Sequence, residues 1–125
     1  MEVNNALKTQ VGGSHYKDLT MQPIEFIVKA GLSFIQGNIV KYISRYKYKN
    51  GAQDIEKCIH YAQLAIDLDS KGPGYGTVGL AYSYCKANNL SCFQSNIISA
   101  CAQDDYYMVI RYCKQLLKME YKNAD

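Results

Sequence analysis

Apolar residues recur at helical spacing along most of the chain, and short polar or glycine-containing breaks separate the segments. Ile35, Ile39, Tyr42 and Tyr46 follow the spacing i, i+4, i+7, i+11, which is typical of one buried helical face. No segment shows the sustained alternation that indicates a β-strand. The chain is therefore predicted to be all-α, a small helical bundle. The breaks place helices over 23–30, 33–49, 53–69, 76–88, 91–102 and 104–121.

The breaks also predict how the helices are organised. Residues 1–20 are polar and glycine-containing, which indicates an irregular N-terminal arm. The Gly/Pro-rich linker 71–76 divides the rest into 15–70 and 77–125. Residues 29–40 match 86–98 with one inserted residue, so the second half reads as a degenerate copy of the first. We predict one domain, 1–125, built from two related α-hairpin units.

Composition narrows the class of protein. A chain of 125 residues is large enough to form one hydrophobic core. Its composition, 48% apolar and 20% charged, is too apolar for a disordered tail. The net charge of +3 does not by itself indicate a nucleic-acid protein, and no binding to duplex nucleic acid is expected. Five cysteines without a C-x-x-C pair predict buried apolar thiols rather than disulfides or zinc ligands. With no signal peptide or membrane span visible, we expect a cytoplasmic protein that does not associate with membranes.

One face of the predicted helix 33–49 carries the candidate chemistry. Asn38, Lys41, Arg45 and Lys49 share this face at i, i+3, i+7, i+11, and Tyr42 and Tyr46 lie among them. Cations hold phosphate and aromatic rings stack on a base, so the set suits a phosphate-bearing nucleotide. The simpler interpretation is a solvated face over a core stripe. The second half has Ser99, Ala100, Cys101 and Gln103 at the matching positions, so a site would belong to the first half.

Other candidates are fewer. His15 and Tyr16 in the arm could close over an anion, or they could be ordinary surface residues. The chain has no Walker phosphate loop, no clustered carboxylates for Mg²⁺ and no Ser-His-Asp or Cys-His set at a recognisable spacing. We therefore assign no catalytic residue, no metal ligand and no cofactor.

A family resemblance adds to this reading. The block G-N-x-x-K-Y-x-x-R-Y at 37–46 resembles the SaV-like phage proteins, together with His15-Tyr16, residues 22–27 and residues 57–61. The resemblance covers about residues 15–68 and implies a phage protein acting in the host bacterial cytoplasm. That family includes a podophage nucleotide kinase without a Walker loop and a member linked to abortive infection. Small phage proteins of this kind also include sponges for cyclic nucleotide signals. The resemblance implies Asn38, Lys41, Tyr42 and Arg45 as site positions, joined by His15 and Tyr16.

The leading hypothesis is a nucleotide-binding protein that sequesters a nucleotide or cyclic nucleotide signal of host anti-phage defence. In it Lys41, Arg45, Lys49, Asn38 and His15 bind phosphate, while Tyr16, Tyr42 and Tyr46 stack on the base. The alternatives are a Walker-less nucleoside monophosphate kinase and a non-catalytic protein that engages a host factor. We expect a homo-oligomer with the site near a subunit boundary, because a single helix face leaves the site open. Arg45→Ala should weaken nucleotide binding, or lower stability instead if Arg45 pairs with Asp54 or Glu25.

Overall fold

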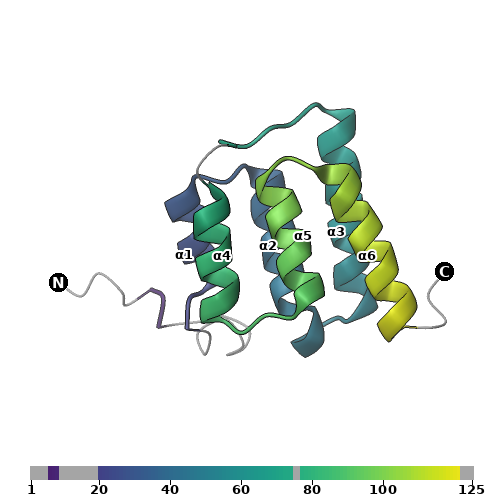
Figure 1. Ribbon diagram of the computed structural model, residues 1–125, viewed down its shortest axis with the longest axis horizontal. Helices are drawn as coiled ribbons and strands as arrows, with labels where there is room; N and C mark the ends of the chain where they lie inside the picture. The colour runs from purple at the N-terminus through teal and green to yellow at the C-terminus, as the bar shows by residue number, and fades with distance from the viewer. Residues whose placement is uncertain (1–5, 9–19, 75–76, 122–125) are drawn as a thin grey trace.

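The computed structural model describes residues 6–8, 20–74 and 77–121, and its regular structure is helical (Figure 1). No strand occurs within these residues, which confirms the all-α prediction. Most of the predicted N-terminal arm, including His15 and Tyr16, lies outside the described residues. The elements are α1 (Pro23–Ala30), α2 (Phe34–Arg45), the 3-10 turn η1 (Tyr46–Tyr48), α3 (Ala52–Asp67), α4 (Thr77–Ala87), α5 (Cys92–Ala102) and α6 (Tyr106–Glu120).

Local signals explain where the helices begin and end. Ser33 and Ser91 each accept a hydrogen bond from the backbone N–H of a glutamine three residues on, and the side-chain oxygen of that glutamine accepts the backbone N–H of the serine. α2 and α5 therefore begin with the same capping box. Gly31 ends α1 in the left-handed conformation at φ 65°. The predicted helix 33–49 is wrong in its last turn: α2 ends at Arg45 and a 3-10 turn follows.

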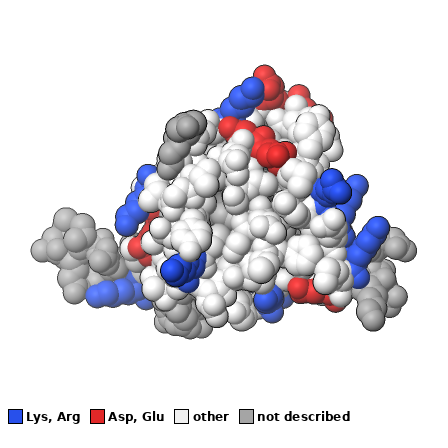
Figure 2. All heavy atoms as spheres, viewed as in Figure 1, with Lys and Arg blue, Asp and Glu red and all other residues white. Residues whose placement is uncertain are grey.

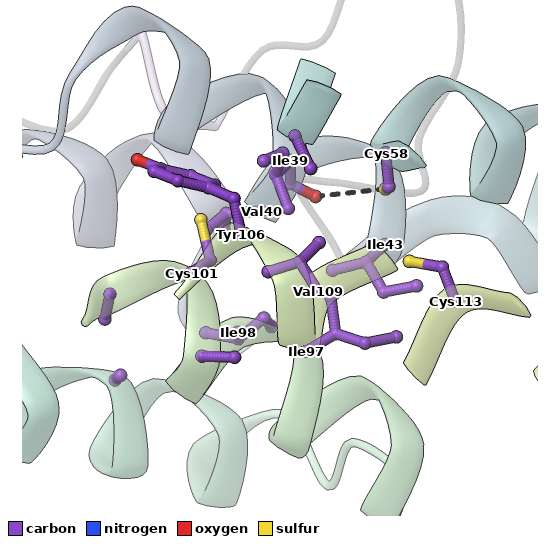
Figure 3. Close-up of a cluster of buried hydrophobic side chains, with 14 of the residues drawn as sticks. Ile39, Val40, Ile43, Cys58, Ile97, Ile98, Cys101, Tyr106, Val109 and Cys113 are labelled. Atoms are coloured by element: carbon purple, nitrogen blue, oxygen red, sulfur yellow. Dashed lines mark hydrogen bonds between the residues drawn. The ribbon is translucent and has the colours of Figure 1, made fainter. Parts of the chain in front are cut away.

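The six helices form two layers of three (Figure 1). One layer holds α1, α2 and α3, and the other holds α4, α5 and α6. Across the layers α1 packs on α4, α2 on α5 and α3 on α6. Between them lies the core, and Figure 3 shows Ile39 and Ile43 of α2 close to Ile97 and Val109 from the other layer. Burying a side chain of this kind contributes about 1.5–3 kcal/mol, so the inner face of α2 is a main source of stability.

Two buried glutamines join the layers reciprocally. Gln36 donates from Nε2 to the backbone oxygen of Cys101 at 3.0 Å, and Gln94 donates from Nε2 to the backbone oxygen of Ile43 at 2.9 Å. Gln36 and Ile43 are spaced in α2 as Gln94 and Cys101 are in α5, so each half gives the other the same bond. Such an exchange is the mark of an isologous, two-fold contact. The two halves therefore pack on one another as the subunits of a symmetric dimer do.

Four of the five cysteines are core residues, as predicted, and all five thiols are free. Cys58 of α3, Cys101 of α5 and Cys113 of α6 lie in the core (Figure 3), and Cys92 is the exposed exception. Burial raises the pKa of the Cys58 and Cys101 thiols well above their ordinary value. These thiols are neutral at physiological pH and act as small apolar side chains. Among the described residues, none of the helices has both the length and the apolar character that crossing a membrane requires.

Candidate functional site

Three cations surround the ring of Tyr42 on the outer side of α2 and α3. The Nζ of Lys41 lies 4.5 Å from the ring centroid, the Cζ of Arg45 lies 4.6 Å from it, and the Nζ of Lys57 lies 4.9 Å from it. Lys41 and Arg45 come from the helix of Tyr42 itself, while Lys57 reaches the ring from α3. The negative face of an aromatic ring attracts cations within about 6 Å of its centroid. The arrangement therefore concentrates positive charge around one half-buried tyrosine.

Arg45 is held in place by a buried carboxylate. Its Nε donates to Oδ2 of Asp54 and its Nη2 donates to Oδ1, both at 3.2 Å. Asp54 is fully buried and also accepts the backbone N–H of Asn50, while the Arg45 side chain is 12% exposed. The structure thus contains the ion pair that the sequence left as the alternative for Arg45. Whether Arg45 also binds phosphate stays a prediction.

An aromatic ladder runs away from the cations. Tyr61 of α3 stacks on Tyr42, with ring centroids 6.0 Å apart and planes inclined by 19°. Phe34, at the start of α2, lies 6.3 Å from the ring of Tyr61 and is 70% exposed. Lys57, Tyr61 and Phe34 are not among the site residues that the sequence predicted. Helical spacing contained a signal for Phe34, since it lies four and seven residues before Asn38 and Lys41 and so shares their helix face. Lys57 and Tyr61 fall in the segment 57–61 that carries the family resemblance, but spacing within α2 cannot connect them to Tyr42.

Tyr46 is not a base-stacking residue, and that prediction is wrong. Its ring is 1% exposed, and its hydroxyl donates to the two carboxylate oxygens of Glu120 at 3.0 and 3.1 Å. Burial, together with this carboxylate, raises the Tyr46 pKa above its ordinary value. No ligand ring can reach it, because the ring is buried and its hydroxyl is bound to Glu120 of α6.

The remaining predicted site residues differ in where they lie relative to the cation cluster. Lys49 is exposed but follows the 3-10 turn, so the helical spacing that joined it to Arg45 does not extend that far. Asn38 lies between Phe34 and Lys41, and its Nδ2 donates to the backbone oxygen of Phe34 at 2.9 Å. His15 and Tyr16 lie outside the described residues, so their predicted roles stay predictions.

The second half has helices that match those of the first half, but it lacks the cations found around Tyr42. The capping-box match places Ser99 and Ala100 of α5 at the positions of Lys41 and Tyr42, and Gln103, which caps the C-terminus of α5, at the position of Arg45. The Nε2 of Gln103 donates to both oxygens of Ser99, so these side chains satisfy one another. Figure 2 shows an almost uncharged surface over the middle of this layer, with charged atoms mainly near its edges. The cation cluster is thus a property of the first half.

The cation cluster is an open surface rather than a deep pocket. A cavity of about 460 Å³ lies instead between α4 and α5, and among its described lining residues Lys86 alone is charged. Lys41 contributes to a smaller cavity of about 130 Å³ against Pro23 and Ile27 of α1. The larger of these two cavities therefore lies in the second half, whereas the side chains that could bind an anion lie in the first half. We place the candidate site at these side chains, because phosphate binding depends on convergent donors and charge more than on enclosed space.

The described residues contain no group of three or more His, Cys, Asp or Glu side chains placed to share a metal ion.

Comparison with known proteins finds one relationship. Residues 8–63, less than half of the chain, match the model of a family described as a protein of unknown function, DUF3310. No curated protein and no solved structure matches the chain. The matched segment contains Tyr42 and all the residues described around it.

Proposed function

We propose that this protein binds a phosphate-bearing nucleotide on the outer face of α2 and α3. The observation that carries the proposal is the convergence of Lys41, Arg45 and Lys57 on the ring of Tyr42. Neither Lys41 nor Lys57 forms an ion pair with a described residue, and both are partly exposed. Like charges held this close repel one another, and an anion such as phosphate relieves that repulsion.

The proposed ligand is held rather than turned over. Cations and aromatic rings make up the cluster, and its carboxylate, Asp54, is committed to Arg45. The resemblance to SaV-like phage proteins supports a ligand class: a nucleotide or cyclic nucleotide signal of bacterial anti-phage defence, sequestered in the host cytoplasm.

To test this, the purified protein is incubated with a nucleotide panel including cyclic dinucleotides, and then denatured by heat. Recovery of intact ligand supports sequestration. Conversion of ATP and a nucleoside monophosphate in the presence of Mg²⁺ would indicate the kinase instead, and no retained ligand would favour the interaction protein.

Lys41→Ala and Lys57→Ala are each expected to weaken nucleotide binding roughly ten- to hundredfold, since a hydrogen bond to a charged group contributes about 1.5–3 kcal/mol. The physical reason is the loss of one phosphate-facing cation while the ring and the other two cations remain. Titration calorimetry with nucleoside triphosphates, at low and at physiological salt, measures the change. The matched control is Lys86→Ala, which removes a lysine placed 5.9 Å from an exposed tyrosine ring in α4. Equal effects from Lys86→Ala and Lys41→Ala would place the ligand elsewhere.

We also propose that the chain forms a homo-oligomer whose second subunit completes the open site. Several large apolar side chains are at least half exposed, and contact between subunits would remove such side chains from water. They include Ile24, Val28, Tyr82 and Met119. A mass measurement in solution at tens of micromolar is expected to give a dimer or larger species. A clean monomer at that concentration would contradict this.

A further inference from the structure

The ring of Tyr42 has little surface left for a ligand. Its surroundings within 5 Å of the centroid include three cationic groups, and the ring of Tyr61 lies stacked against it at 6.0 Å. A ring has two faces, and a base could stack on Tyr42 only by displacing one of these neighbours. Tyr42 therefore serves as the platform that gathers the cations. A base would have to find its stacking partner elsewhere.

Phe34 offers that partner. It is 70% exposed, belongs to the same ladder through Tyr61, and lies at the end of the ladder away from the cations. Seven residues of α-helix separate Phe34 from Lys41, which is about 10 Å along the axis. That span is comparable with the reach of a nucleotide from its base to its outer phosphates. Between the two ends lies Asn38, whose side chain is partly exposed.

We propose that Phe34 and Tyr61 are the base-stacking residues of the site, and that the ligand lies along α2 with its phosphates at Lys41 and Lys57. This inference rests on the proposed function and adds to it an orientation and a class of ligand. The ligand is a nucleotide bound through both its base and its phosphates, rather than a polyphosphate or a sugar phosphate bound through charge alone. Stacking on an aromatic side chain tolerates any base, so the site selects for the presence of a base more than for its identity.

The second half contains a useful comparison. The capping-box match places Cys92 of α5 at the position of Phe34, and the cations beside Tyr42 are also missing there. The exposed ring and the charge cluster thus occur together in the first half and are absent together from the matching positions of the second. A role for Phe34 in packing alone would not explain why this exposed ring occurs in the same half as the cations. Phe34 also follows the N-cap Ser33 directly, so its substitution leaves the hydrogen bonds of the capping box in place.

The test compares two probes on three proteins by titration calorimetry. The probes are a panel of the four ribonucleoside triphosphates and inorganic tripolyphosphate, and the proteins are the full chain, Phe34→Ala and Phe34→Trp. Phe34→Ala is expected to weaken triphosphate nucleotide binding roughly tenfold while leaving tripolyphosphate binding unchanged, because one stacking contact is lost and no charge is altered. Phe34→Trp is expected to retain or improve nucleotide binding. The matched control is Tyr107→Ala, which removes a ring that is 72% exposed on α6 and should change neither affinity.

The outcomes separate the two levels of the proposal. If Phe34→Ala leaves nucleotide affinity unchanged while Lys41→Ala lowers it, the stacking role is wrong and the phosphate site stands. If Phe34→Ala weakens both probes equally, Phe34 supports the site structurally and the inference is also overturned. If the full chain binds neither probe and retains no member of the nucleotide panel that includes cyclic dinucleotides, the proposed function fails and the inference fails with it. A change in oligomer mass caused by Phe34→Ala without any loss of nucleotide affinity would assign this ring to a subunit contact instead.

Discussion

Arg45→Ala is expected to lower the free energy of unfolding by about 3–5 kcal/mol, because it leaves the buried carboxylate of Asp54 without its cation. The loss is large since Asp54 is fully buried and both its oxygens accept from the Arg45 guanidinium. Urea unfolding followed by circular dichroism measures the change. Arg45→Lys should recover only part of it, because an ammonium cannot reproduce the two parallel bonds of the guanidinium.

The matched control for Arg45 is Lys57→Ala, which removes a cation at a similar distance from Tyr42 but with no ion pair to a described residue. It should change the free energy of unfolding by well under about 1 kcal/mol. The double variant Arg45→Met with Asp54→Leu removes both charges, and it should be more stable than Arg45→Ala. A stability of Arg45→Ala equal to that of the unmodified chain would show that the ion pair does not hold α2 to α3.

This pairing changes how the role of Arg45 in ligand binding must be tested. Loss of binding in Arg45→Ala would be ambiguous, because an unfolded or loosened α2–α3 pair also loses the cations of Tyr42. Affinity measured on Arg45→Lys, well below its melting temperature, separates the two roles. A folded Arg45→Lys with weakened nucleotide binding would support direct phosphate contact, as the sequence analysis predicted. Unchanged affinity with reduced stability would leave Arg45 a purely structural residue.

Gly72→Ala is expected to destabilise the fold by about 2–4 kcal/mol, by overpacking and by breaking buried hydrogen bonds. A Cβ on Gly72 would overlap the side-chain amide of Gln36, which is fully buried. That amide cannot move without cost, because it accepts from the Ser33 N–H in the capping box and donates to the Cys101 backbone oxygen. One methyl group on the linker would therefore disturb both the start of α2 and its contact with α5. Thermal unfolding measures the loss.

Gly79→Ala is the matched control for Gly72. Gly79 lies inside α4, and a Cβ there would meet nothing within 4 Å. Alanine favours the helix over glycine by about 0.8–1 kcal/mol, so this variant should raise the melting temperature slightly. Destabilisation by Gly79→Ala, or none by Gly72→Ala, would contradict the packing described around Gln36.

Much of the fold could be predicted from the sequence because local interactions determine where most of its helices begin and end. Gly31, Ser33 and Ser91 act through bonds to residues within one turn, so their effect can be seen without knowing the fold. The end of α2 was misplaced for the opposite reason. The side chains of Arg45 and Asp54 and the backbone N–H of Asn50 form a network across the α2–α3 turn, and such a network has no periodic signal. The chain turns before Lys49 although the residues there would permit another helical turn.

The candidate site divides in the same way. Helical spacing determined that Asn38, Lys41 and Arg45 lie on one face of α2, since this follows from 3.6 residues per turn alone. Only the tertiary structure decided which tyrosine gathers the cations, because Tyr46 is buried with its hydroxyl on Glu120 of α6, while Tyr42 is half-buried among three cations. It also brought Lys57 and Tyr61 to that ring from α3, a helix whose rotation about its axis is set by packing of its apolar side. Spacing within a helix relates residues of that helix, whereas contacts between helices depend on how the two layers bury their cores.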